Sequence, residues 1–158
     1  MGTVMANTYT QINIHAVFSI KGRANLLKKS FRGDLFKYIF GILKNNKQYP
    51  LAVNGYKDHV HIFFELHPTT SISEILRIVK TNSSKWINQN SYVNGKFSWQ
   101  EGYGAFSYSR SQRDNVIQYI VKQEEHHEKR TFKEEYLDLL QKFEIKFDNH
   151  YVFEFYDK

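Results

Sequence analysis

Residues 58–66 have the sequence DHVHIFFEL, which predicts a β-strand. Aromatic and β-branched residues dominate this stretch, and Gly55 and Pro68 flank it. Side chains two residues apart on a strand point to the same face, so we expect His59 and His61 to lie side by side. Two neutral imidazoles in that arrangement can bind one divalent cation. The alternative is an ordinary strand with two partly buried histidines, and the pair alone does not decide between the two.

The segments around this strand alternate between strand and helix patterns. Alternating or β-branched residues predict strands at 9–18, 50–56, 58–66 and 103–109. Apolar residues at helical spacing predict amphipathic helices at about 30–46 and about 71–89. The turn dipeptide Asn54-Gly55 leads directly toward the histidine strand and makes the second and third strands neighbours. The order β-α-β-β-α-β predicts an α+β fold of the split βαβ type, with a four-stranded antiparallel sheet.

Two further helices are predicted in the C-terminal third. Ser109 or Ser111 can cap a helix over about residues 112–129. Thr131 and Glu134 have the spacing of a capping box and begin the next helix. We therefore expect the helices after the fourth strand to extend the βαβ core.

The helix over 112–129 carries a tyrosine outside its apolar stripe. That stripe consists of Val116, Ile117, Ile120 and Val121. At about 100° per residue, Tyr119 lies about 130° from the centre of the stripe, so the core does not need it. Gln123 follows at i+4 and lies on the same side, one turn later. Such a helix can present a nucleophile and an oxygen ligand to one point, although two surface residues would give the same pattern.

Composition is that of a soluble domain. The 158 residues are most simply one domain, 1–158, with room for a hydrophobic core. No apolar run approaches the roughly 20 residues of a membrane span, and the N-terminus lacks a signal-peptide pattern, so we expect a cytoplasmic protein. Because the chain has no cysteine, disulfides, thiolate metal sites and a cysteine nucleophile are excluded.

Charge is unevenly distributed along the chain. The net charge of +6 combines +10 over residues 1–123 with −4 over residues 124–158. Eight basic residues and one acid, Asp34, fall between Lys21 and Lys47. This asymmetry indicates a body that faces a polyanion such as nucleic acid, although a solvated basic helix face would look the same.

Several stretches together resemble the TnpA-like single-tyrosine HUH transposases, small enzymes of insertion sequences that move as single-stranded DNA. The matching stretches are DHVH at 58–61, KTNSSKWIN at 80–88, WQEGYG at 99–104 and YIVKQEEHH at 119–127. The match continues through FKEEY at 132–136 to YV at 151–152, so it covers nearly the whole chain in order. This ordered set is far more specific than either the histidine pair or the tyrosine alone.

The resemblance implies a role for four residues. His59 and His61 correspond to ligands of a divalent metal, and Gln123 is similar to the family's third protein ligand. Tyr119 corresponds to the nucleophile that attacks single-stranded DNA and forms a 5′-phosphotyrosine link with a free 3′-hydroxyl. Family members bind hairpins at the ends of the element and usually act as homodimers, in which one subunit supplies the tyrosine to the other. The sequence itself leaves open whether the site forms within one chain or across two.

The chemistry is consistent with these roles. A free phenol has a pKa of about 10, so it needs help to lose its proton and a polarised target. A cation held by two imidazoles and an amide oxygen can bind a phosphate oxygen and stabilise the departing 3′-oxygen. This nitrogen and oxygen donor set suits Mg²⁺ or Mn²⁺, although Zn²⁺ or Ni²⁺ would also bind in vitro. The sequence identifies no general base.

Several other residues each allow more than one interpretation. Lys80, Lys85 and Trp86 are candidate hairpin contacts. For Trp86, a role as an anchor in the core is an equal alternative. Candidate phosphate contacts near the cleaved bond are Arg110, Arg113 and Lys122. His126 and His127 can supply a ligand, but a solvated pair at a helix end is the simpler interpretation. Asp58 is expected to be a turn residue rather than a partner of the metal ligands.

Three functions are therefore compared. The first is a metal-dependent transposase that nicks and joins single-stranded DNA through Tyr119. The second is a non-catalytic module that binds DNA or RNA hairpins on a similar sheet, which would have no need of a metal site. The third is a hydrolase that uses His59 and His61 to activate water, for which the sequence offers no obvious acidic ligands nearby. Covalent attachment of Tyr119 to DNA would distinguish the first from the others.

Overall fold

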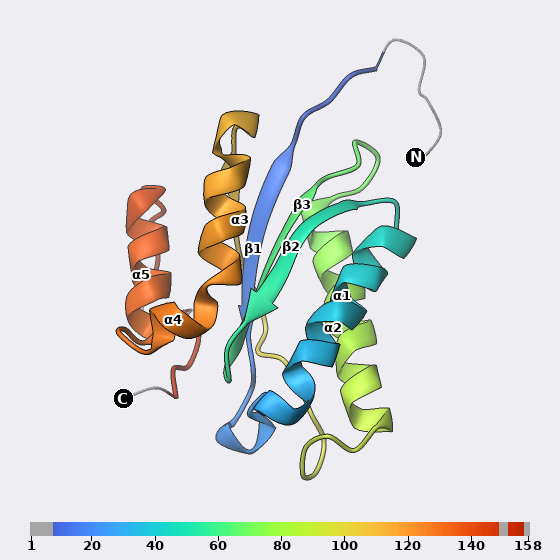
Figure 1. Ribbon diagram of the computed structural model, residues 1–158, viewed down its shortest axis with the longest axis vertical. Helices are drawn as coiled ribbons and strands as arrows, with labels where there is room; N and C mark the ends of the chain where they lie inside the picture. Colours follow the sequence, from blue (N-terminus) through green and yellow to red (C-terminus); the bar gives the residue numbers. More distant parts are fainter. Residues whose placement is uncertain (1–7, 149–151, 157–158) are drawn as a thin grey trace.

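A four-stranded antiparallel sheet forms the centre of the computed structural model, which describes residues 8–148 and 152–156 (Figure 1). Its strands are β1 (Asn13–Ser19), β2 (Tyr49–Gly55), β3 (His59–Glu65) and β4 (Gly104–Tyr108). They lie in the order β2-β3-β1-β4, so the histidine strand is central. The predicted α+β fold of the split βαβ type is confirmed. The single domain over 1–158 stays a prediction, because residues 1–7, 149–151 and 157–158 lie outside the described part.

One face of the sheet is covered by α1 (Lys29–Asn45) and α2 (Ile72–Gln89) (Figure 1). The strand residues that face these helices are all buried and apolar: Ile14, Ala16, Phe18, Val60, Ile62 and Phe64. Both helices begin and end close to the predicted positions, and Ser71 caps α2 by accepting a hydrogen bond from the backbone N–H of Glu74. This layer is the main hydrophobic core.

The opposite face is covered by α3 (Arg113–Val121), α4 (Gln123–His127) and α5 (Phe132–Lys142) (Figure 1). Two short 3₁₀ turns complete the described structure, at Arg23–Asn25 and Arg110–Gln112. The capping box at the start of α5 is confirmed. Thr131 Oγ1 accepts from the backbone N–H of Glu134, and Glu134 Oε1 accepts from the backbone N–H of Thr131.

The prediction of one continuous helix over 112–129 is wrong. The helix ends at Val121, and Lys122 has φ −97° and ψ 21° before α4 begins. Asn54 of β2 explains the break, because its side-chain Nδ2 donates to the backbone carbonyls of Ile120 at 3.0 Å and Val121 at 3.2 Å. A side chain from the sheet thus satisfies acceptors that the end of a helix leaves free.

No helix within residues 8–148 and 152–156 combines the length and apolar character that crossing a membrane requires.

Candidate active site

Strand β3 directs both histidines of the His-x-His pair toward α3, α4 and α5, where His59 and His61 are fully buried. The tight approach of β2 to β3 at this point depends on Gly55. A side chain at Gly55 would collide with the backbone carbonyl oxygen of His59. The glycine that the sequence marks as a turn residue therefore lets the hairpin close beside the first histidine.

Helix α5 docks against this pair through two aromatic residues. The Phe132 ring stacks on the His59 ring, with centroids 4.0 Å apart. Tyr136, one turn later, lies against β4 where Gly104 has no side chain; a Cβ there would lie 2.7 Å from the Tyr136 hydroxyl oxygen. These contacts turn Glu135, between them in sequence, toward the histidines.

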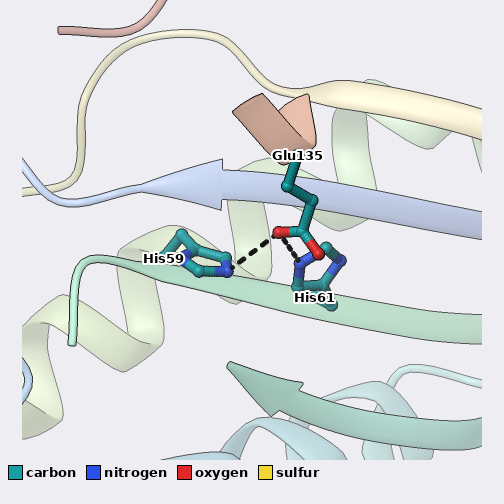
Figure 2. Close-up of side chains that lie close together, drawn as sticks. All are labelled: His59, His61 and Glu135. Carbon is teal, nitrogen blue, oxygen red and sulfur yellow. Dashed lines mark hydrogen bonds and ion pairs between the residues drawn. The ribbon is translucent and has the colours of Figure 1, made fainter. Parts of the chain in front are cut away.

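The Glu135 carboxylate is the centre of the buried cluster (Figure 2). Its Oε1 lies 3.3 Å from His59 Nε2 and 3.0 Å from His61 Nε2. His127 Nε2 lies 3.1 Å from the same oxygen. The ligand atoms of His59, His61 and Glu135 are close enough together to hold one metal ion. Glu135 was not predicted from the sequence, and the prediction that His127 is solvated is wrong, because its side chain is buried.

Gln123 also lies in this cluster. Its Oε1 lies 3.1 Å from His59 Nε2 and 3.2 Å from His127 Nε2, and its Nε2 donates to Glu135 Oε2 at 3.0 Å. The side chain is fully buried even though it starts a new helix. The break between α3 and α4 thus leaves Gln123 in the cluster.

A second buried side chain contacts the Nδ1 atom of each histidine, His59 and His61. Asp58 Oδ1 lies 2.7 Å from His59 Nδ1, and His15 Nε2 lies 2.7 Å from His61 Nδ1. Such partners orient the ring and fix which nitrogen faces the site. The expectation that Asp58 serves as a turn residue is therefore incomplete, because its carboxylate orients His59. His15 was not considered, and its Nδ1 has no hydrogen-bond partner within the described residues.

The charges in the cluster depend on one another. Burial alone would lower the pKa of His59, but hydrogen bonds and charge from Asp58 and Glu135 outweigh it and raise the pKa to about 10. Burial would raise the pKa of Glu135, but His61, His127 and His59 hold it well below its ordinary value. Burial lowers the pKa of both His61 and His15. Without a metal, the site therefore pairs a protonated His59 with an ionised Glu135.

Tyr119 reaches the same carboxylate from α3. Its hydroxyl donates a short hydrogen bond to Glu135 Oε2, and the ring stacks on His126 with centroids 4.7 Å apart. Arg130 Nη2 donates to the Tyr119 hydroxyl oxygen at 3.3 Å. Burial, together with the Glu135 charge, raises the pKa of Tyr119 above its ordinary value. The candidate nucleophile and the histidine pair thus meet within one chain.

The candidate hairpin contacts lie on the other side of the sheet, along α2. A groove of about 950 Å³ separates α2 from the segment 96–103, and Lys80 and Lys85 line it. Lys80 Nζ donates to the backbone carbonyls of Gln100 at 2.8 Å and Gly102 at 2.7 Å, so it fixes the groove wall. Lys85 is exposed. Trp86 stacks on Tyr38 with centroids 5.0 Å apart and packs against the core.

The three basic residues predicted near the cleaved bond have different surroundings. Arg113 is bound to Glu65 at 3.0 Å and to Asn13 Oδ1 at 2.9 Å. Arg110 is exposed in the turn before α3, and Lys122 is exposed at the break after it. The basic residue that touches Tyr119 is instead Arg130, which sequence reasoning did not single out.

The fold and the cluster together define a class of protein: a small α+β protein in which a His-x-His strand and a helix tyrosine share one site. The chain belongs to the family described as "Transposase IS200 like", whose sequence pattern matches residues 8–123. The matched segment includes the histidine pair, Tyr119 and Gln123 and ends before Glu135. The resemblance seen in the sequence is confirmed at the level of the family.

Solved structures share the fold. A transposase from Deinococcus radiodurans R1 matches with a TM-score of 0.59 and 20% identity, over 78% of this chain and 98% of that one. A REP-associated tyrosine transposase, solved bound to a REP hairpin, matches with a TM-score of 0.57 and 13% identity, over 80% of this chain and 74% of that one. None of the curated proteins matches the chain.

Proposed function

We propose that this transposase-family chain cleaves and rejoins single-stranded DNA through a covalent link to Tyr119, in a metal-dependent reaction. The observation that carries the proposal is the meeting of Tyr119, His59, His61 and Gln123 around one buried carboxylate, Glu135. A hairpin-binding module without catalysis would have no use for such a buried, mutually oriented set of groups.

The donor set fits a divalent cation. His59 Nε2 and His61 Nε2 would hold it together with oxygens of Gln123 and Glu135, while Asp58 and His15 keep the rings oriented. Nitrogen and oxygen donors without sulfur suit Mn²⁺ or Mg²⁺. When bound, such an ion supplies positive charge that polarises a phosphate and stabilises a departing oxygen. Glu135 adds a negative ligand to the set implied by the resemblance.

The chain's own residues prepare Tyr119 for attack. Glu135 Oε2 accepts the hydrogen bond of the hydroxyl and so holds the oxygen in place. In the proposed step, Tyr119 Oη bonds to phosphorus and its proton passes to water. The bond from phosphorus to the 3′ oxygen breaks, and that oxygen takes a proton from water. The products are a 5′-phosphotyrosine and a 3′-hydroxyl, which preserve the bond energy for rejoining.

The proposal places the site within one chain. The resemblance favours homodimers that exchange the tyrosine, whereas here Tyr119 contacts Glu135 of its own chain. Mixing the Tyr119→Phe and His59→Ala variants tests this arrangement. If each chain uses its own tyrosine, the mixture stays inactive; if subunits exchange it, the mixture regains activity.

We also propose that the groove along α2 binds the stem of a DNA hairpin. Arg77, Lys85 and Lys96 line this groove and make no hydrogen bond or ion pair in the part of the chain that the structure describes. Unpaired basic side chains along a groove suit a phosphate backbone. The hairpin bound to the structurally similar REP-associated transposase supports this choice of ligand.

The experiment that tests the function uses labelled single-stranded oligonucleotides from the DNA that flanks the gene. Wild type and Tyr119→Phe are incubated with Mn²⁺ and run on denaturing gels. We expect a labelled protein adduct that is absent from the variant and after chelation. Binding without an adduct would support the non-catalytic hairpin binder, and metal-dependent cutting that persists in Tyr119→Phe would support the hydrolase.

A further inference from the structure

The Tyr119 side chain lies between two different environments. On one side is the Glu135 cluster, whose His59 and His61 rings are fully buried. On the other side is a cavity of about 220 Å³. Its wall includes Tyr108, Tyr119, Arg130, Asp138, Leu139 and Lys142. Because the Tyr119 hydroxyl contacts Glu135, a phosphate that enters from this cavity reaches the Tyr119 oxygen next to the candidate metal site.

Arg130 holds a central position in the cavity wall. It lies between α4 and α5, and its Nη2 donates to the Tyr119 oxygen at 3.3 Å. Its Nη1 donates to Asp138 Oδ2 at 2.7 Å, which fixes the plane of the guanidinium. A guanidinium has five N–H donors in a rigid fork that matches the oxygens of a phosphate. Arg130 therefore retains donors for a ligand while it touches the nucleophile.

The cavity combines positive charge with an apolar wall. Lys142 Nζ lies 5.6 Å from the centre of the Tyr108 ring, and Arg130 faces the same space. Asp138 is the one acidic side chain in the wall, and it is paired with Arg130. Glu135 lies behind the Tyr119 hydroxyl and is paired with the histidines, so within the wall itself the two cations exceed the single anion and favour an anionic ligand. Tyr108 and Leu139 offer the kind of surface on which a nucleobase packs.

We propose that this cavity is the subsite for the cleaved phosphodiester of a single-stranded nucleic acid, and that Arg130 is a catalytic residue that binds its non-bridging oxygens. The inference rests on the proposed function. Reacting atoms must approach to about 3–3.5 Å before a bond forms. A phosphate that close to the Tyr119 oxygen lies within reach of a guanidinium that already touches that oxygen. Arg130 then stabilises the charge that develops on the phosphate as Tyr119 attacks.

This assignment differs from the basic residues that the sequence suggested. Arg113 precedes the tyrosine on the same helix, but Glu65 and Asn13 already occupy its guanidinium. Arg130 lies eleven positions after Tyr119, outside the matched family segment 8–123. Docking of α5 brings it back to the tyrosine.

The test separates binding from chemistry. The wild-type adduct first locates the cleaved phosphate. Affinity is then measured by fluorescence anisotropy in the Tyr119→Phe background, with and without Arg130→Ala. Two oligonucleotides are compared, one natural and one with an uncharged methylphosphonate at the cleaved position. We expect Arg130→Ala to weaken binding of the natural strand about 10- to 100-fold, as for charged hydrogen bonds, and to leave the methylphosphonate strand unchanged.

Two controls distinguish this role from a structural one. Lys133→Ala removes one positive charge from the exposed start of α5, outside the cavity wall, and should weaken both strands by the same small factor. Arg130→Gln keeps a hydrogen-bond donor without the charge and should behave like Arg130→Ala. When Tyr119 is left in place, both Arg130 variants should form the adduct at least tenfold more slowly than wild type.

Three outcomes would overturn the inference. Equal loss of affinity for both strands would make Arg130 a structural residue. An unchanged affinity together with a wild-type rate of adduct formation would remove it from the site. If wild type forms no adduct with any flanking strand, the proposed function fails and the inference fails with it.

Discussion

The two faces of the central sheet are built from alternate residues of the same strands, yet they are stabilised in different ways. Toward α1 and α2, β1 and β3 present only apolar side chains, Phe64 among them. Toward α3, α4 and α5, the same two strands present His15, His59 and His61, which are buried with Gln123 and Glu135. The apolar face is held by the area it removes from water. The second, polar face also buries apolar residues, Val17 and Phe63 among them, but its polar groups can be buried only because they are paired with one another.

This difference means that the two faces should respond differently to pH and to metal. Loss of an apolar contact lowers stability under every condition. Loss of a polar contact changes stability by an amount that depends on protonation and on whether a cation is bound.

The largest expected effect is on the apolar face. Phe64→Ala removes a fully buried ring and should lower the free energy of unfolding by about 3–5 kcal/mol. Urea denaturation measures this loss. The rise in melting temperature on adding Mn²⁺ should stay as in wild type, because Phe64 faces away from the histidines. A change in that rise would contradict the separation of the two faces.

Glu135→Gln tests the polar face through pH. The pKa of Glu135 is lowered in the folded protein, so its contribution is present above its ordinary pKa of 4.5 and lost as pH falls below it. The pKa of His59 is raised to about 10, so its contribution is full below 6.5 and lost as pH rises through 10. We expect the free energy of unfolding of the metal-free variant to be roughly 1.5–3 kcal/mol lower than that of wild type at pH 5.5. Its stability should also change less with pH than that of wild type, both below pH 4.5 and above pH 6.5.

Urea denaturation of the metal-free protein between pH 3 and pH 10 measures the effect. Glu125→Gln, at an exposed position of α4, serves as a control and should keep the shape of the wild-type profile. Identical profiles for wild type and Glu135→Gln would show that the carboxylate is not coupled to the histidines.

A smaller effect is expected from replacing His15, which contacts the Nδ1 atom of His61. His15→Phe keeps the size of the ring but removes the partner of His61 Nδ1, and it should weaken Mn²⁺ binding about 10- to 100-fold. Isothermal titration with Mn²⁺ measures this affinity directly. His15→Gln should recover part of the loss, because an amide can still bond to the imidazole. Wild-type affinity in His15→Phe would make His15 a packing residue only.

The smallest effect compares one helix cap on each face. Thr131→Ala and Ser71→Ala each remove a side-chain oxygen that accepts from a backbone N–H, and each should lower stability by about 1 kcal/mol. Only Thr131→Ala should also weaken Mn²⁺ binding, because α5 carries Glu135 whereas α2 packs on the other face. Equal effects on Mn²⁺ binding would contradict a role for α5 in the site.

Local sequence patterns were enough to predict the fold and half of the candidate site. The period of two residues along a strand puts His59 and His61 on one face, and the order of elements leaves few arrangements for a sheet of four strands. The capping box at Thr131 was also predicted, because both of its partners lie within four consecutive residues.

Contacts between elements decided the rest. Glu134 and Glu135 are adjacent and chemically equivalent in the sequence, but docking of α5 leaves one exposed and buries the other among three histidines. Asn54 ends α3 from a different element, and Arg130 returns to Tyr119 across the connection between α4 and α5. Periodicity determines which way a side chain points from its own helix or strand. The group it meets there depends on which element packs opposite, and that is a property of the folded chain.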